Sequence, residues 1–399
     1  MTHTLTRRHL LALSGAALAT PAFAQNTTAW STIEAKAKGQ TVYFNAWGGA
    51  ETINAYIQWA ASEVEKRFGV KVEHVKVTDA ADVVKRVRNE KAAGKINGTA
   101  DLVWINGENF LTMKREGLLF GPFAEGLPSY ARVDVKGKPT TRIDFSEPTE
   151  GMEAPWGMAQ LTFMVDSKRT PKPPRSLAEL LAFAKANPGR VTYPRPPNFH
   201  GTTFLKQLLV NSSEYPSAFY KPVAMESFAK ATAPLWATLD QLHPHLWRAG
   251  KQFPQNAEAM RQMLADGELQ LALTFNPNDA ANEIAANRLP ASVISYQFSS
   301  GTIGNTHFVA IPVNASAKEG AQVFANFLLG AEAQARKADI AVWGDPTVLA
   351  LDKLGGVERA RFAAKPLPGQ VEKSAPAIPE PHGSWVEPIE KEWTRRYGA

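Results

Sequence analysis

Residues suited to holding a small molecule stand in four short polar segments, each between an apolar run and a helical pattern, and at one isolated Trp. Indole rings stack on flat solutes, Asn amides donate and accept hydrogen bonds, and carboxylates pair with cations. These chemistries favour reversible binding of a small polar molecule. The candidate ligand-binding residues are Trp47, Gly48, Gly49, Asn106, Glu108, Asn109, Trp156, Arg195, Thr202, Thr203, Asn276, Asn278 and Asp279.

Each candidate also has a purely structural interpretation. Gly48 and Gly49 leave room for a ligand near the backbone, and they equally fit a tight turn beside a core Trp47. Trp156 fits a cleft floor, although a packed core position is the stronger interpretation. The Asn, Asp and Thr candidates fit helix capping as well as ligand binding. Arg195 favours a carboxylate or phosphate, whereas the carboxylates favour a cation.

Signatures of catalysis are missing from the sequence. It holds no G-x-S-x-G, H-E-x-x-H, Walker A or G-x-G-x-x-G pattern. It also has no Cys, which excludes disulfides, thiolate catalysis and Cys-ligated zinc or iron–sulfur centres. The pair His243 and His245 has no third ligand marked nearby, so two loop imidazoles are the better interpretation. We therefore expect no metal, no cofactor and no catalytic residues.

The first 24 residues have the three parts of an export signal. Arg7 and Arg8 precede a short apolar run over 10–18, and Ala22-Phe23-Ala24 offers a cleavage site. The Arg pair also fits a twin-arginine signal, so general secretion and twin-arginine export both stay open. No Cys is available for a lipid anchor. We therefore expect a free periplasmic protein after cleavage.

Composition is typical of a globular chain too long for one core. The sequence has 399 residues, 44% of them hydrophobic and 21% charged, which favours two lobes. The formal net charge of +6 falls to +4 when Arg7 and Arg8 leave with the signal. No block of five basic residues occurs, so nucleic acid is a poor candidate partner.

The elements that would position the candidates alternate between strand and helix. Such alternation predicts a parallel sheet covered by helices, with ligands bound beyond the carboxyl ends of the strands. In the first half the expected strands are 41–44, 70–77 and 101–105, and the expected helices are 51–68, 79–92 and 110–116.

The second half restarts the alternation after an apolar stretch at 158–166, which we interpret as a strand crossing to a second lobe. A capping box at Ser176 and Glu179 opens a helix to 186. Segment 301–306 is expected to be a hinge or a hairpin loop, and a second crossing between lobes is a candidate near 300–310. The other expected strands are 190–193, 269–275, 293–298 and 308–313, and the other expected helices are 202–211, 256–266, 279–287 and 318–329.

Three stretches give the chain a family resemblance, namely 41–49, 100–110 and 192–201. The chain resembles the periplasmic solute-binding proteins of bacterial ABC importers, of the type II fold, and among them the YnjB-like branch near the thiamine-, polyamine- and iron-binding families. The resemblance implies an α/β fold of two lobes, each a mainly parallel sheet with flanking helices, joined by crossing strands. It implies a monomer that captures a solute and delivers it to a membrane permease with a cytoplasmic ATPase.

Division of the chain follows from this resemblance. We expect a signal peptide at 1–24, a first lobe of 26–157 with about 307–345, and a second lobe of about 158–306 with 346–399. Iron-binding relatives carry adjacent Tyr ligands, and this chain has no Tyr-Tyr pair, so we favour a thiamine- or polyamine-like organic cation. A secreted enzyme on the same scaffold, or a receptor domain for a membrane sensor, stays the alternative.

Overall fold

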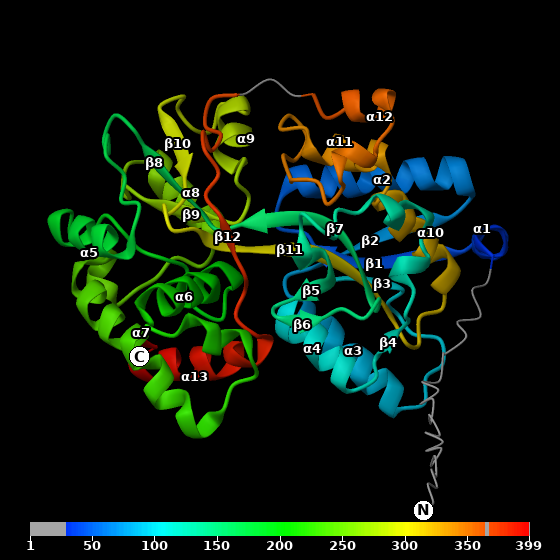
Figure 1. The fold of residues 1–399 in the computed structure, drawn as a ribbon, viewed down its shortest axis with the longest axis horizontal. Helices are drawn as coiled ribbons and strands as arrows, with labels where there is room; N and C mark the ends of the chain where they lie inside the picture. The colour runs from blue at the N-terminus through cyan, green and yellow to red at the C-terminus, as the bar shows by residue number, and fades with distance from the viewer. Residues whose placement is uncertain (1–28, 364–366, 399) are drawn as a thin grey trace, which may run out of the picture.

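The computed structural model describes residues 29–363 and 367–398. Two bodies lie side by side, and strands β7 and β11 run from one toward the other (Figure 1). Each body has its own large hydrophobic core. We call the body that contains β1 the first lobe and the body that contains β8 the second lobe. The expected signal peptide falls outside the described residues.

Parallel strands build the centre of the first lobe, as the sequence predicts. β1 (Thr41–Trp47) pairs in parallel with β2 (Lys71–Val77) and β3 (Leu102–Ile105). β1 and β3 are largely apolar and buried, which suits burial between layers of helices, whereas β2 at the edge of the sheet alternates Val with charged residues. The helices of this lobe are α1 (Trp30–Ala37), α2 (Glu51–Phe68), α3 (Ala80–Ala92), α4 (Gly107–Arg115), α10 (Lys318–Leu328), α11 (Ala331–Ala338) and α12 (Gly356–Ala360).

Helix boundaries in this lobe follow local chemistry. α2 ends at Gly69, which takes the left-handed conformation with φ 66° that its position in the sequence predicts. The Asp79 carboxylate accepts a hydrogen bond from the Ala81 N–H and so caps α3. The Asp79 cap lies in the turn that follows β2, at the carboxyl end of the strand, whereas Gly69 lies at the opposite edge of the sheet, before β2.

Two strands connect the lobes, at the expected crossing of 158–166 and at the second candidate crossing near 300–310. β7 (Glu153–Gln160) pairs with β11 (Thr302–Pro312) in the first sheet, and β8 (Thr162–Asp166) directly follows it in the second. The expected crossing at 158–166 is confirmed, with a break at Leu161. Of the two alternatives for 301–306, the hairpin loop is wrong, because the segment lies in β11 except for Gly301. This part of β11 consists mainly of small and β-branched residues, and it pairs with β12 (Ala377–Ile378) and with β7.

The second lobe corrects the expectation of a mainly parallel sheet. β8 pairs antiparallel with both β9 (Ala272–Thr274) and β10 (Val293–Tyr296). In the first sheet β11 also runs antiparallel to β3 and β7. A buried strand has the same apolar pattern in parallel and antiparallel pairing, so the sequence does not predict the direction of the strand. In segment 190–193, residues 191–193 are buried and Arg190 is exposed, and the segment forms too few ladder bonds to be a strand.

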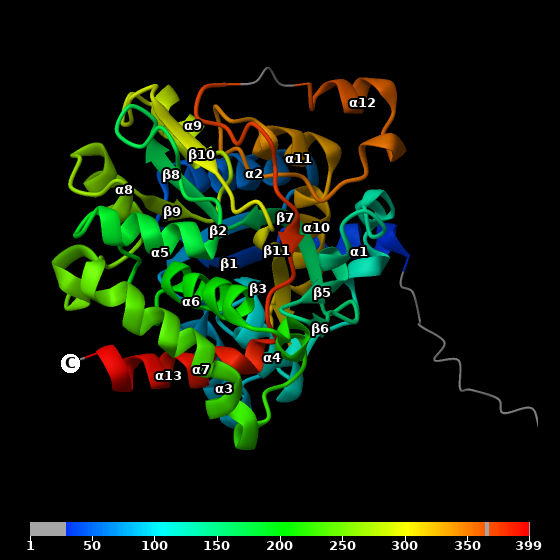
Figure 2. The same ribbon diagram turned by 60° about the vertical axis from the view of Figure 1, so that its left-hand side comes forward.

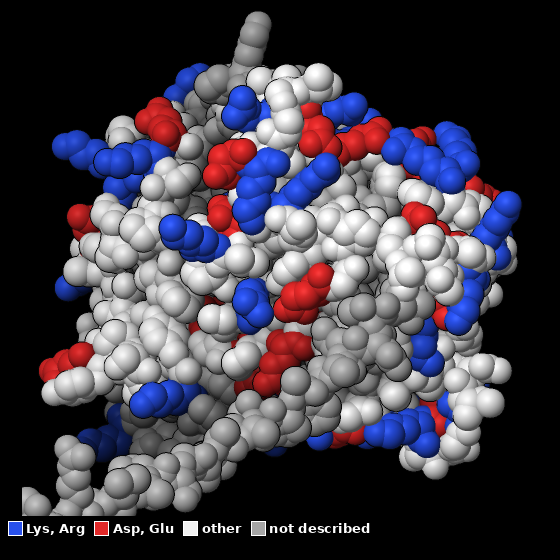
Figure 3. All heavy atoms as spheres, turned by 45° about the vertical axis from the view of Figure 1, so that its right-hand side comes forward, with Lys and Arg blue, Asp and Glu red and all other residues white. Residues whose placement is uncertain are grey.

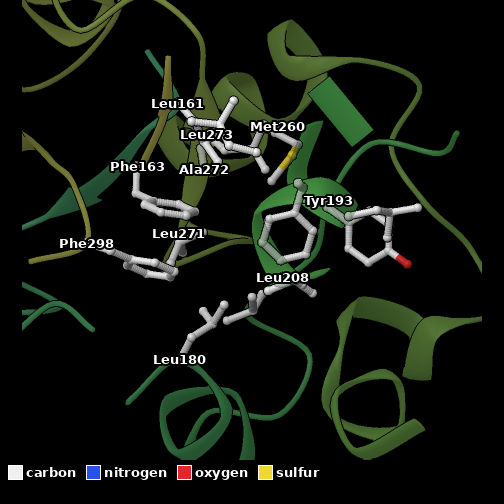
Figure 4. Close-up of a cluster of buried hydrophobic side chains, with 14 of the residues drawn as sticks. Leu161, Phe163, Leu180, Tyr193, Leu208, Met260, Leu271, Ala272, Leu273 and Phe298 are labelled. Atoms are coloured by element: carbon white, nitrogen blue, oxygen red, sulfur yellow. The ribbon is translucent and has the colours of Figure 1, made fainter. Parts of the chain in front are cut away.

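Helices surround that small sheet on the outer side of the second lobe (Figure 2). Leu161, Phe163, Leu208 and Leu273 meet in its core (Figure 4). The expected capping hydroxyl of Ser176 accepts from the Glu179 N–H at 3.2 Å. The helices are α5 (Leu177–Ala186), α6 (Phe199–Ser212), α7 (Met225–Leu242), α8 (Ala257–Ala265), α9 (Asp279–Ala285) and α13 (Val386–Tyr397).

The C-terminal part of the chain passes between the lobes once more. Val348, Leu349 and Leu354 pack in the first core, and Trp385 and Trp393 pack in the second. We therefore propose that the first lobe extends past 346 to about 362 and that the second lobe resumes near 367. The other division points of the chain stay as proposed from the sequence.

The molecular surface carries both signs of charge. On the face shown in Figure 3, Lys and Arg side chains alternate with Asp and Glu side chains. Within 29–363 and 367–398, no helix has the length and apolar character that a bilayer span requires.

Candidate functional site

The carboxyl ends of β1, β2 and β3 bring three polar turns to one edge of the first sheet. They hold Trp47 to Gly49, Asp79, and Asn106 to Asn109. Across from them lie the first turns of α6 and the middle of α13 from the second lobe. The carboxylate of Glu108 is close enough to Lys206 and Glu390 of the second lobe for their charges to alter its pKa. The predicted edge of the first lobe therefore faces the second lobe.

Glu108 is the best-placed of the predicted residues. Loss of water around the carboxylate raises its pKa to about 7, Lys206 opposes the rise, and Glu390 and Asp79 add to it. The Asn109 amide donates to Glu108 at 3.3 Å. At neutral pH the carboxyl group is therefore close to half ionised and gains from any added cation.

Lys206 is the main positive charge at this interface, and it is already paired. Its Nζ lies 2.7 Å from Glu380 Oε2, and both side chains are 1% exposed. The ammonium also lies 4.1 Å from the ring centroid of Phe145, which belongs to the β5–β6 hairpin (Ile143–Asp144, Glu147–Pro148) of the first lobe. The lysine therefore forms its direct ion pair with Glu380, and its charge acts on Glu108 and Glu390 only through space.

Helix α6 begins three residues earlier than expected, and this changes the role of its threonines. The N-cap is Asn198, whose side chain accepts from the His200 N–H. Thr202 and Thr203 consequently lie inside the helix and do not cap it. The Thr202 hydroxyl donates to Glu390 Oε1 at 2.6 Å, and the buried Thr203 hydroxyl has no hydrogen-bond partner. Thr202 therefore orients a carboxylate at the interface.

Asn106 and the turn from Trp47 to Gly49, also predicted in the first lobe, make contacts with the protein itself. Asn106 donates to the Thr306 carbonyl at 2.5 Å and so ties the end of β3 to β11. Trp47 packs its ring against Gly49, where any Cβ would collide with it. Gly49 thus makes room for the indole, and Gly48 makes room for the side chain of Lys76. The indole stays partly exposed at the lobe edge.

Trp156 lies in the core and not on a cleft surface. Its exposed fraction is 0%, and its ring contacts the rings of Trp104 and Trp343. The ammonium of Lys337 lies 5.5 Å from its ring centroid, and Asp345 pairs with that ammonium at 2.5 Å. The aromatic cluster therefore already has a cation beside it, the ammonium of Lys337.

The Asn276–Asp279 turn of the second lobe is held by protein groups. Asp279 pairs with Arg261 at 2.9 Å, and burial raises its pKa while Arg261 lowers it. Burial next to this pair lowers the pKa of His200 to about 4. The Asn276 and Asn278 amides donate to carbonyls of the first lobe.

Arg195 lies apart from the other candidates. Its exposed guanidinium donates to the Gly398 carbonyl at 3.0 Å and lines a cavity of about 260 Å³ with Trp247 and Tyr397. Another cavity of about 540 Å³ lies on the first lobe, between Trp59, Arg336 and Arg361. No group of three or more His, Asp or Glu side chains suited to a metal ion occurs in the described residues.

Sequence reasoning missed Lys206, Glu380, Glu390 and the role of Asp79. Lys206 had a signal, since it stands among Phe204, Leu205, Leu208 and Leu209, where a charge is unusual. Glu380 and Glu390 lie in a Pro-rich tail and a charged helix, where the sequence gives no sign that the chain returns to the interface.

Comparison with known proteins supports this architecture. Residues 59–350 match the family of bacterial extracellular solute-binding proteins. The chain is 49% identical to protein YnjB of Escherichia coli K12 over 94% of its own length and 95% of that protein's.

Two solved structures show the fold at low identity. The periplasmic binding protein AfuA of Actinobacillus pleuropneumoniae, solved with fructose-6-phosphate, has a TM-score of 0.62 at 14% identity, covering 90% of this chain and 99% of that one. A spermidine/putrescine ABC transporter protein of Listeria monocytogenes, named as putative, has a TM-score of 0.59 at 17% identity, covering 90% and 98%. The chain therefore belongs to the family of bacterial extracellular solute-binding proteins, the non-enzymatic solute-binding components of ABC transport.

Proposed function

We propose that this protein captures a small organic cation between its two lobes and delivers it to an ABC permease. One observation supports the charge of the solute above all. Glu108, Glu390 and Asp79 share one electrostatic environment, and Lys206, the basic side chain whose charge acts on Glu108, is paired with Glu380. Carboxylates left without a cation gain when a cationic solute enters a water-poor site.

The location of these groups supports capture between lobes. Glu108 and Asp79 belong to the first lobe, and Glu390 belongs to α13 of the second. A solute that pairs with both sides stabilises the closed arrangement by its differential affinity for that arrangement. Trp47, partly exposed on the same edge, offers a face for an organic group or a cation.

Thermal shift against a panel of thiamine, polyamines, quaternary amines, sugar phosphates and carboxylates tests the proposal. A cation at 100 times its Kd should stabilise the protein by about 2.7 kcal/mol. Glu108→Gln and Glu390→Gln should each weaken that cation at least tenfold, about 1.4 kcal/mol. Glu387→Gln is the matched control, because Glu387 is exposed on the same helix α13. Stabilisation by sugar phosphates alone would contradict the proposed charge.

Binding should also depend on pH through Glu108. Its pKa of about 7 means that the carboxylate becomes fully charged between pH 6 and 8. Cation affinity should therefore rise about three- to tenfold over this range, and Glu108→Gln should remove most of the rise. Isothermal titration at pH 6, 7 and 8 measures it, and affinity that falls with pH would contradict it.

The site of action follows from the family and the sequence. We propose a periplasmic location after cleavage near residue 24, by general secretion or twin-arginine export, with a membrane permease and ATPase as partners. We also propose a monomer. Secreted enzymatic activity on this scaffold has no support, because the family to which the chain belongs binds solutes without converting them.

A further inference from the structure

Three asparagines of the second lobe donate their side-chain amides to the backbone of the first lobe. They flank the start of α9, which packs through Ala280 in the second core, whereas Trp343 packs in the first core. Figure 1 shows α9 and α11 facing each other across the division between lobes. The four hydrogen bonds run from Asn276 to Trp343 at 3.1 Å, from Asn278 to Gly344 at 2.6 Å, and from Asn282 to Ile340 at 2.8 Å and Trp343 at 3.0 Å.

The first lobe is shaped to receive these amides. Gly344 has φ 78°, in the left-handed region, and a Cβ there would lie 2.8 Å from Asn278 Cβ. Only glycine therefore allows the second lobe to approach this closely. The acceptors are main-chain carbonyls of the turn after α11, so the contact does not depend on charge or on a bound solute.

We infer that Asn276, Asn278 and Asn282 with the turn 340–344 form an asparagine latch that holds the lobes closed without solute. Each amide has a carbonyl partner on the opposite lobe, and opening exchanges these partners for water. The latch therefore raises the closed fraction of the solute-free protein. Less of the binding free energy of the solute is then needed to close the lobes, which raises the apparent affinity of the solute.

Gln370 extends the latch along the chain segment that passes between the lobes. Its amide donates to Asn278 Oδ1 at 3.2 Å, and a Cβ at Gly369 would touch the α9 backbone at Ala281. Asn278 is thus held on its oxygen by the passing segment and on its nitrogen by the first lobe. Asn278 and Asn282 together donate three of the four hydrogen bonds between lobes, so replacing both should open the latch most.

Distance measurements between the lobes test the latch without any solute. Because the sequence has no Cys, Ser62→Cys on α2 and Ala285→Cys on α9 provide the only two labelling points, and both positions are exposed. Pulsed electron spin resonance then reports the distribution of distances between lobes. The test variants are Asn278→Ala and the double variant Asn278→Ala with Asn282→Ala.

Asn187→Ala is the matched control, because the Asn187 amide donates to the Phe183 carbonyl within a single lobe at 2.9 Å. The latch variants should increase the population at longer distance at least fivefold, and the control should leave the distribution unchanged. Circular dichroism confirms that each variant is folded. Distributions identical to the parent in both latch variants would overturn the inference. No solute is needed, so this outcome is independent of the proposed solute.

Discussion

Glu153 on β7 is a buried side chain that makes the free energy of unfolding depend on pH. It is 1% exposed, and neither carboxylate oxygen has a hydrogen-bond partner. Burial raises its pKa well above the ordinary value, Asp144 adds to the rise and Lys114 opposes it. Because the folded-state pKa lies above the unfolded value, the folded form is favoured at low pH and loses stability as pH rises above about 4.5.

Glu153→Gln should therefore stabilise the protein more at pH 8 than at pH 5, with a gain of about 1–3 kcal/mol at pH 8. Urea unfolding at both pH values measures the difference. Glu65→Gln, at an exposed position of α2, should change stability by less than about 0.5 kcal/mol at either pH. Equal destabilisation by Glu153→Gln at both pH values would show that Glu153 accepts a hydrogen bond that matters more than its charge.

The position of a single residue could be predicted where the neighbouring sequence determines it. Glu108 directly follows a strand, so its position at the sheet edge could be predicted from the sequence. Trp156 was expected at a cleft floor or in the core, and the structure places it in the core because Trp104 and Trp343 surround it. Glu390 could not be found, since its partner Thr202 lies 188 residues away.

Strand β7 carries the strongest packing constraint at the scale of elements. A Cβ on Gly157 would collide with Asp345 and Lys337, the buried ion pair beneath the strand, and with His307 on β11. Gly157→Ala should therefore separate this pair and cost about 2–4 kcal/mol. Gly126→Ala, where nothing lies within 4 Å of the added Cβ, should be close to neutral. Calorimetric melting compares the two, and a neutral Gly157→Ala would contradict the packing described.

Elements in the first lobe were predictable because caps and glycines mark them. The expected helices at 51–68 and 79–92 are bounded by Gly69 at the end of the first and by Asp79 at the start of the second. The second sheet was mispredicted as parallel, because direction depends on how β8 enters from the first lobe. The start of α6 was missed because Asn198 follows two prolines, which read as loop, yet its side chain caps the helix.

For the whole molecule, two lobes with facing polar edges were predicted from the βα alternation and from the family resemblance. Contacts between lobes were not predictable, because they depend on how two separate cores are placed. The Asn276 and Asn278 amides illustrate this, since the sequence suggests a solute and the structure gives them carbonyls of the first lobe.

Hydrogen–deuterium exchange with the stabilising cation tests capture between lobes most directly. Protection is expected in both lobes at once, after β1 and β3 in the first and at the start of α6 and the middle of α13 in the second. Protection confined to one lobe, such as the cavity beside Trp59 or the one beside Arg195, would contradict it.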